Sequence, residues 1–89
     1  MVYFVYILEC ADHTLYVGST NDLQKRLHAH NYLKSGARYT KSRRPVVLKY
    51  SESFRSRGKA LRREGEIKNL TRQEKLDLLQ SSDERKRKA

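Results

Sequence analysis

Several residues that could take part in catalysis lie on predicted helix faces that a protein of this size is expected to fill with apolar side chains. In the stretch LYVGSTNDLQKRLHAH, Arg26 and His30 share a predicted helix face with Leu23 and Leu27. In a later predicted helix, Glu64 projects from among apolar residues. A guanidinium, an imidazole and a carboxylate that meet in one cleft can bind a phosphate or a metal ion and transfer protons. A buried Arg26–Glu64 ion pair explains the same spacing, and the pattern leaves both interpretations open.

Six tyrosines in 89 residues add phenol groups to this set. Tyr6 and Tyr16 fall within a predicted hairpin, and they share a face of the sheet only if the connecting loop holds an odd number of residues. The sequence does not fix the length of that loop. Tyr32 and Tyr39 flank a basic segment, where a phenol ring can stack on a base or fill a gap beneath the loop.

The spacing of the other reactive residues disfavours several alternative chemistries. Cys10 is the single cysteine, so it has no partner for a disulfide or a metal-binding pair. His28 and His30 point to different faces of a helix, so the three histidines do not form a zinc set. The glycine-containing segment at 18–20 is too short for a phosphate loop, and nothing marks a nucleophile elbow.

Charge is distributed unevenly along the chain, whose formal net charge is +10. Residues 1–22 contain no Lys or Arg, whereas residues 23–50 contain basic but no acidic side chains. This asymmetry favours a polyanion, above all nucleic acid, as the partner; an idle basic surface is the alternative, and a membrane surface is less favoured. The basic residues of the central loop, which are expected to contact phosphates, are Lys34, Arg38, Lys41, Arg43 and Arg44.

Hydrophobic patterns and capping signals predict a small α/β (α+β) domain over residues 1–80. A mainly antiparallel three-stranded sheet would be flanked by about three helices, with Thr20 or Asn21 as the cap of the first helix. A basic, disordered tail is expected at 81–89. The predicted strands lie at 2–8, 15–18 and 46–52; the predicted helices lie at 23–33, 56–69 and 71–79; and a loop is predicted at 33–44.

Length and cysteine content place limits on the class of protein. A chain of 89 residues has room for a single domain with a modest core. A lone cysteine and the lack of a long apolar run or leader-like segment indicate a soluble intracellular protein. We therefore expect a cytoplasmic protein, with association with the nucleoid as a variant of that expectation.

Three segments, VYFVYILECADHTLYVGSTNDLQKRLHAHN, GARYTKSRRPVVLKYSE and KALRREGEIKNLTRQEKLDLL, resemble the GIY-YIG nuclease superfamily in composition and order. The resemblance is to the small stand-alone prokaryotic branch of single-domain proteins. Tyr6 matches the final tyrosine of the family's first motif, in which Phe4 replaces the leading glycine and Val5 takes the middle position. The second motif is matched by the YVG at 16–18.

The resemblance implies roles for the residues singled out above. Arg26 stands ten residues beyond Tyr16, at the position of the family arginine, and His30 stands where several members have a histidine. Glu64, in an A-x-x-x-E helix, falls on the family's metal-binding glutamate. The implied reaction is hydrolysis of DNA phosphodiesters with one Mg²⁺ or Mn²⁺ ion on Glu64 and with Arg26 on the scissile phosphate. Tyr6 or Tyr16 would be the general base, oriented by the other tyrosine and His30.

Two departures from the family pattern bear on activity. Ser19 stands where some members have a lysine near the phenols, so Arg26 or the metal ion must favour the phenolate. An appended DNA-recognition domain is not expected, so substrate choice would come from the basic loop, from nucleic acid structure or from a protein partner. The resemblance thus implies a structure-selective endonuclease of DNA repair or processing; a nucleic-acid-binding module with little or no catalytic activity is the alternative.

Overall fold

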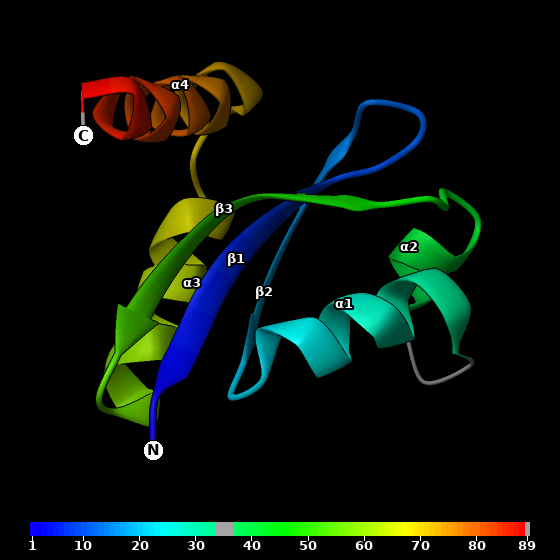
Figure 1. Cartoon of the computed structure of the whole chain (residues 1–89), viewed down its shortest axis with the longest axis horizontal. Coiled ribbons are helices and arrows are strands. Elements are labelled where there is room, and N and C mark those ends of the chain that lie inside the picture. Colours follow the sequence, from blue (N-terminus) through cyan, green and yellow to red (C-terminus); the bar gives the residue numbers. More distant parts are fainter. Residues whose placement is uncertain (34–36, 89) are drawn as a thin grey trace.

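The computed structural model describes residues 1–33 and 37–88, with side chains as far as Ser81. A small sheet lies between helices, and the last helix lies across one end of the molecule (Figure 1). This arrangement confirms the predicted α+β class. The elements in chain order are β1 (Tyr3–Glu9), β2 (Leu15–Thr20), α1 (Leu23–Tyr32), α2 (Arg38–Lys41), β3 (Val47–Phe54), α3 (Arg57–Lys68) and α4 (Arg72–Lys88).

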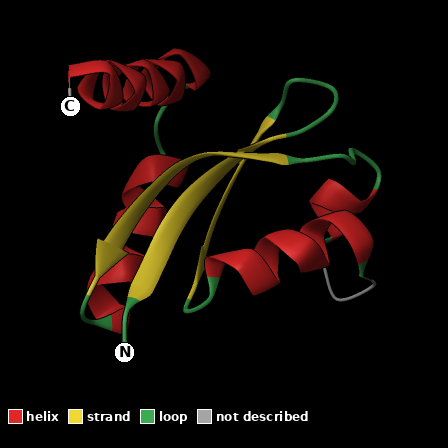
Figure 2. Cartoon of the chain, in the orientation of Figure 1, coloured by secondary structure: helices red, strands yellow, loops and turns green. Residues whose placement is uncertain are grey.

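Strand β1 is the middle strand of an antiparallel sheet whose order is β2-β1-β3. Helix α3 covers one face of this sheet, and α1 with α2 covers the other (Figure 2). A strand covered on both faces must be apolar on both, which explains the continuous VYIL run at 5–8, buried along its whole length.

Successive side chains of β1 serve two different cores. Val5 and Ile7 belong to the apolar cluster that includes Ala60 and Ile67 of α3. Tyr6 and the following Leu8 belong to a second cluster on the side of α1. Because side chains alternate across a strand, β1 sends the aliphatic Val5 and Ile7 toward α3 and the phenol of Tyr6 toward α1.

The loop of the β1–β2 hairpin resolves the question about the two tyrosines. Five residues, 10–14, separate the two strands, an odd number. The register pairs Tyr6 with Gly18 and Leu8 with Tyr16. Directly paired residues share a face, so Tyr6 and Tyr16 both lie on the α1 side of the sheet.

The helix ends are fixed by capping side chains. The predicted cap of α1 at Thr20 or Asn21 is wrong: Asp22 is the cap, and its carboxylate accepts from the backbone N–H of Lys25 at 3.1 Å. The Thr20 hydroxyl instead accepts from the N–H of Asp22, which positions the capping residue. Helix α3 is capped by Ser56, as its predicted start requires.

The segment predicted as a loop contains a short helix, α2, so that prediction is wrong in part. The carbonyl of Ala37 accepts from the backbone N–H groups of Thr40 and Lys41 and from the Thr40 hydroxyl. Such a turn has no apolar period and depends on contacts with the rest of the fold, which is why sequence patterns miss it. Residues 34–36, and Lys34 with them, lie outside the described residues.

The predicted end of the last helix near Leu79 is also wrong, because α4 continues to Lys88. Residues 72–88 contain neither glycine nor proline, so nothing in the backbone stops the helix. Its start follows the prediction, since Thr71 and Glu74 form a capping box through bonds of 2.9 and 3.2 Å.

Arg44 joins the end of α1 to the start of β3. Its guanidinium donates to the carbonyls of His30 at 2.6 Å, Ala29 at 3.2 Å and Leu33 at 2.6 Å, around the end of the helix, where Ala29 also accepts from the backbone N–H of Leu33. Arg44→Ala is therefore expected to lower the free energy of unfolding by about 2 kcal/mol, measured by urea denaturation. Arg38→Ala, a change at an exposed arginine of the neighbouring α2, is the control and should leave that free energy unchanged.

Candidate active site

A chain of three hydrogen-bonded side chains lies beneath α2. The Tyr6 hydroxyl lies 2.9 Å from Nε2 of His30, and Nδ1 of His30 lies 2.9 Å from the Thr40 hydroxyl. Thr40 donates its one proton to the carbonyl of Ala37 at 2.9 Å, so toward His30 it acts as an acceptor. His30 then carries its proton on Nδ1, and Nε2 accepts from the Tyr6 hydroxyl.

Burial and neighbouring charge keep this chain neutral. Burial raises the pKa of Tyr6 to about 12, although the Arg26 guanidinium, a hydrogen-bonding neighbour of the phenol, acts in the opposite direction. Burial, followed by the positive charges of Arg26 and Arg44, lowers the pKa of His30 to about 4. At neutral pH the site therefore holds a protonated phenol and a neutral imidazole, as the hydrogen bonds require.

The lowered pKa of His30 predicts a pH dependence of stability. Folding takes this pKa from 6.5 to about 4, so between these values the unfolded chain binds a proton that the folded chain does not. Stability should therefore fall as the pH falls through this window, by on the order of 3 kcal/mol in total. Urea denaturation from pH 7 to 4.5 should show this loss in wild type and in His28→Gln, but not in His30→Gln. A loss of equal size in His30→Gln would contradict the assignment.

Tyr16 lies between the imidazole and the surface. Its ring meets His30 edge-on at 5.1 Å between centroids and stacks on Tyr39 of α2 at 6.0 Å. The Arg43 guanidinium lies over the ring of Tyr39, 4.0 Å from the ring centroid, and also pairs with Asp12 at 3.1 Å. This stack of rings connects the site to the β1–β2 hairpin loop.

The close packing of the phenols against Gly18 explains why the second motif ends in glycine. A Cβ atom at this position would lie 2.5 Å from the Tyr6 hydroxyl and 3.2 Å from the ring of Tyr16. The phenol of Tyr6 thus crosses directly over the backbone of β2, and any side chain at Gly18 would displace it from His30.

Glu64 approaches the phenols from α3. Its side chain is 15% exposed, and its two oxygens accept from the Ser19 hydroxyl at 2.7 Å and pair with Lys68 at 2.8 Å. Burial would raise the pKa of this carboxyl, but the bonds from Lys68 and Ser19 together outweigh burial and lower it. Glu64 also interacts electrostatically with Tyr6, and its partner Lys68 interacts with Tyr16.

The donor set around Glu64 fits a hydrated magnesium-type ion rather than a closed protein cage. Among the described residues no group of three or more His, Cys, Asp or Glu side chains could surround a metal. Mg²⁺ commonly uses one or two carboxylates and takes its remaining ligands from water and substrate phosphates. An ionised Glu64 beside the Ser19 hydroxyl satisfies that requirement, and the ammonium of Lys68, whose side chain is 54% exposed, can be displaced into solvent.

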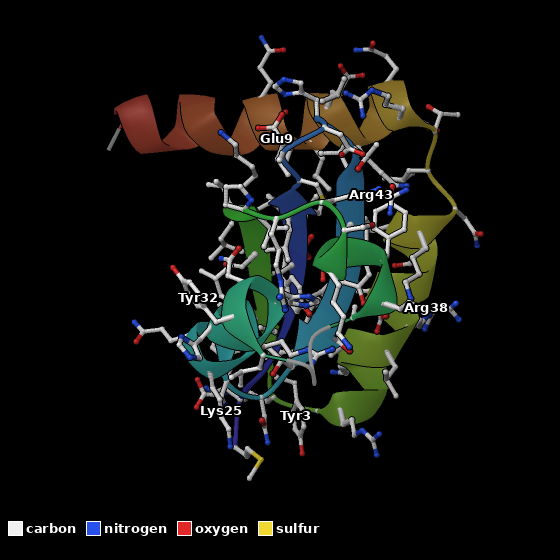
Figure 3. The ribbon with its side chains drawn as sticks, turned by 90° about the vertical axis from the view of Figure 1, so that its right-hand side faces the viewer. Tyr3, Glu9, Lys25, Tyr32, Arg38 and Arg43 are labelled. Carbon is white, nitrogen blue, oxygen red and sulfur yellow. The ribbon has the colours of Figure 1, made fainter. Side chains whose placement is uncertain are left out.

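The four predicted phosphate-binding residues that the structure describes lie on the α1–α2 side, in two different situations; Lys34 lies outside the described residues. Arg38 and Lys41 are exposed, and Figure 3 shows Arg38 extending away from the ribbon. Arg43 and Arg44 are half-buried and committed to contacts within the protein, with Asp12 and Tyr39 and with the end of α1.

Two surface hollows of about 250 Å³ each lie on either side of the turn between β2 and α1. Thr20 and Asn21 line both. One also reaches Ser19, the partner of Glu64, together with Arg57, and the other reaches Arg26. Of the sequence-predicted catalytic residues, Arg26 thus lines one depression directly, and Glu64 is linked to the other through its bond with Ser19.

Two residues of this site were missed from the sequence. Lys68 stands four positions after Glu64, a spacing that favours an ion pair on a helix and could have identified it. Thr40 has no such signal, because its place in the site depends on the fold of α2 against α1.

Comparisons with known proteins identify the family. The chain matches the GIY-YIG catalytic domain family over residues 2–77. It is 52% identical over 82 residues to a UPF0213 protein of Syntrophus aciditrophicus, covering 92% of this chain and 94% of that protein. A UPF0213 protein of Staphylococcus haemolyticus is 50% identical over 78 residues, covering 88% and 94%.

Two structures solved by solution NMR share the fold. The UPF0213 protein of Bacillus halodurans gives a TM-score of 0.59 at 40% identity, covering 90% of this chain and 84% of that one. A protein of E. faecalis gives 0.64 at 34% identity, covering 93% and 88%. In the described part of the chain, no helix has the length and apolar character needed to cross a membrane. The motifs, the fold and these matches together show that the chain belongs to the GIY-YIG catalytic domain family, in its small stand-alone UPF0213 group.

Proposed function

We propose that this protein is a divalent-metal-dependent endonuclease that hydrolyses DNA phosphodiester bonds in repair or processing, selecting nucleic acid structure rather than sequence. The observation that carries the proposal is the buried Tyr6–His30 pair, to whose phenol Arg26 is hydrogen-bonded and with whose phenol Glu64 of α3 interacts electrostatically. A proton acceptor, a phosphate-binding cation and a metal-binding carboxylate are the parts that phosphodiester hydrolysis needs. Nuclease function in general is also what membership of the GIY-YIG family implies.

Tyr6 is the general base in this proposal, because it is the phenol bonded to an imidazole acceptor. A pKa raised to about 12 for Tyr6 and lowered to about 4 for His30 favours a neutral resting pair over a phenolate–imidazolium pair. Tyr6 therefore passes its proton to Nε2 of His30 as it takes one from the attacking water. The water oxygen bonds to phosphorus while the bond to the leaving oxygen breaks, and that oxygen takes a proton from solvent. His30 then gives its extra proton back to the Tyr6 oxygen as Tyr6 releases a proton to solvent, which returns both side chains to their neutral forms.

The other side chains stabilise charge and position the substrate. Arg26 neutralises the scissile phosphate with a fork of donors, and Tyr16, stacked between His30 and Tyr39, orients the water. Glu64 would hold Mg²⁺ or Mn²⁺, with Ser19 fixing the carboxylate; the bound ion supplies Lewis-acid stabilisation of the leaving oxygen.

The two hollows beside the site could hold the nucleic acid strand, with its sugar–phosphate backbone in one hollow on each side of the scissile phosphate. In the cytoplasm, the exposed Arg38 and Lys41 would add phosphate contacts on the α2 side, with Lys34, Arg43 and Arg44 as further members of the basic footprint. The shallow, open form of these hollows favours recognition of backbone geometry, and a protein partner could add selectivity.

The salt dependence of binding tests this footprint. Removing two phosphate contacts with Arg38→Ala and Lys41→Ala should lower the slope of log affinity against log salt by about 1 to 2, measured by fluorescence anisotropy. Lys49→Ala with Arg72→Ala, two exposed basic residues away from α2, removes the same charge and should change the slope less. Equal slopes for the two double variants would place the footprint elsewhere.

A substrate panel tests the function itself. Wild-type protein would be incubated with labelled single-stranded, duplex, branched and flapped DNA and RNA in Mn²⁺, Mg²⁺ or EDTA. We expect metal-dependent cleavage of a branched or flapped DNA. Binding throughout the panel without cleavage would instead favour a nucleic-acid-binding module, the second candidate, which the existing pairing of Glu64 with Lys68 supports.

A further inference from the structure

The environment of His30 contains a residue to which none of the roles above is given. Thr40 is fully buried, lies ten residues beyond His30 and occupies Nδ1, the ring nitrogen remote from Tyr6. A buried hydroxyl in a four-residue helix has to be satisfied on both its donor and acceptor sides. Ala37 takes the donor side, so the acceptor side is fixed toward the imidazole.

The direction of these bonds decides which tautomer His30 adopts. With a proton on Nδ1, the bare Nε2 accepts from Tyr6 and can take its proton. With the proton on Nε2, the imidazole would donate to the Tyr6 oxygen, and the transfer needed to activate that phenol could not occur. One neutral tautomer therefore allows the Tyr6 proton to move to His30, and the other does not.

Among the groups around the imidazole, Thr40 is the one that can determine the tautomer of His30. Tyr6 of β1 can donate or accept, and Tyr16 of β2 meets the ring edge-on. Arg26 of α1 and Arg44 after α2 disfavour the imidazolium, but act on both tautomers. Thr40 is the neighbour whose bond demands a proton on one named nitrogen.

We propose that Thr40 is a positioning residue of the nuclease site: its hydroxyl, committed to the Ala37 carbonyl, holds His30 in the Nδ1–H tautomer so that Nε2 can take the Tyr6 proton. The catalytic part of this inference rests on the proposed nuclease function. The tautomer part does not, because it follows from the hydrogen bonds alone.

Three substitutions separate the hydroxyl from the shape of the side chain. Thr40→Val keeps the branched shape and removes the hydroxyl, Thr40→Ser keeps the hydroxyl, and Thr40→Ala serves if valine prevents folding. The tautomer would be read from ¹⁵N chemical shifts of the His30 ring, since protonated and bare nitrogens are well separated. Cleavage would be followed by single-turnover kinetics on the best substrate of the panel, with circular dichroism as the control for folding.

Wild type and Thr40→Ser should show the Nδ1–H tautomer, with cleavage rates within about threefold of each other. Thr40→Val should show the Nε2–H tautomer or a mixture, and cleave at least about tenfold more slowly with substrate affinity unchanged. The proposal is overturned if wild-type His30 carries its proton on Nε2, or if Thr40→Val, or Thr40→Ala in its place, keeps the wild-type tautomer.

The two proposals fail in different ways. If wild type does not cleave but the tautomer responds to Thr40→Val, the nuclease function fails while the link between Thr40 and His30 stands. If wild type cleaves and Thr40→Val switches tautomer without a loss of rate, the nuclease function stands and the positioning role of Thr40 fails.

Discussion

Glu64→Gln is expected to abolish metal-dependent cleavage while leaving nucleic acid binding equal or slightly tighter. Glutamine keeps the shape of the side chain and an oxygen for the Ser19 hydroxyl, but removes the charge that would hold the ion. Removing a negative charge beside a phosphate-binding cleft also reduces repulsion of the substrate. We expect the cleavage rate to fall at least about 1000-fold, equivalent to about 4 kcal/mol, in single-turnover assays with Mn²⁺ or Mg²⁺.

Glu66→Gln is the matched control for this experiment. Glu66 lies two positions further along α3, is exposed and pairs with Arg63 at 3.6 Å, so the same change is made away from the phenols. It should cleave as wild type does. Cleavage by Glu64→Gln at the wild-type rate would remove Glu64 from the metal site, whereas loss of binding in parallel with cleavage would point to misfolding.

Tyr6→Phe is expected to lower the cleavage rate by about 10² to 10⁴ without weakening binding. The substitution keeps the ring over Gly18 and removes the hydroxyl that bonds to His30, and with it the proton path to the imidazole. Tyr50→Phe is the matched control. Tyr50 has a pKa also raised to about 12, by burial and then by Glu52, but it belongs to the core on the α3 side.

The corresponding change at the other phenol distinguishes the two candidate bases. Tyr16→Phe should lower the cleavage rate less than Tyr6→Phe does, because Tyr16 contributes its ring, which phenylalanine keeps, to the contacts with His30 and Tyr39. A larger loss in Tyr16→Phe would make Tyr16 the base and leave Tyr6 as the orienting group. Both rates would be compared under single-turnover conditions, with substrate affinity measured separately.

Much of the fold follows from local sequence. The apolar run at 2–8 predicts the first strand, and Ser56, Asn69 and the Thr71–Glu74 pair mark helix ends that the structure confirms. The likeness to GIY-YIG nucleases supplied the candidate residues. The hairpin register then determined that Tyr6 and Tyr16 face the same side, a matter of loop parity that the sequence left open.

Other features depend on contacts between distant segments and could not be read from local patterns. Helix α2 has four residues and no apolar period, yet it places Thr40 against His30. Arg44 was expected to contact phosphates because it lies in a basic run, but three carbonyls around the end of α1 already occupy its guanidinium. Charge in a sequence shows neither which cations face solvent nor which are committed to the backbone.

The alternation of side chains along β1 places the parts of the site in elements that open at different free-energy cost. Tyr6 belongs to the central strand, between two partner strands and two apolar clusters, where amide hydrogens exchange only through opening of the whole domain. Thr40 belongs to a single helical turn, an element whose local opening costs far less than global unfolding. Tyr6, the proposed base, is thus displaced only when the whole domain opens, whereas Thr40, the proposed positioning residue of His30, can detach while the rest of the domain stays folded. Transient opening of α2 would leave a folded protein with a misaligned proton path.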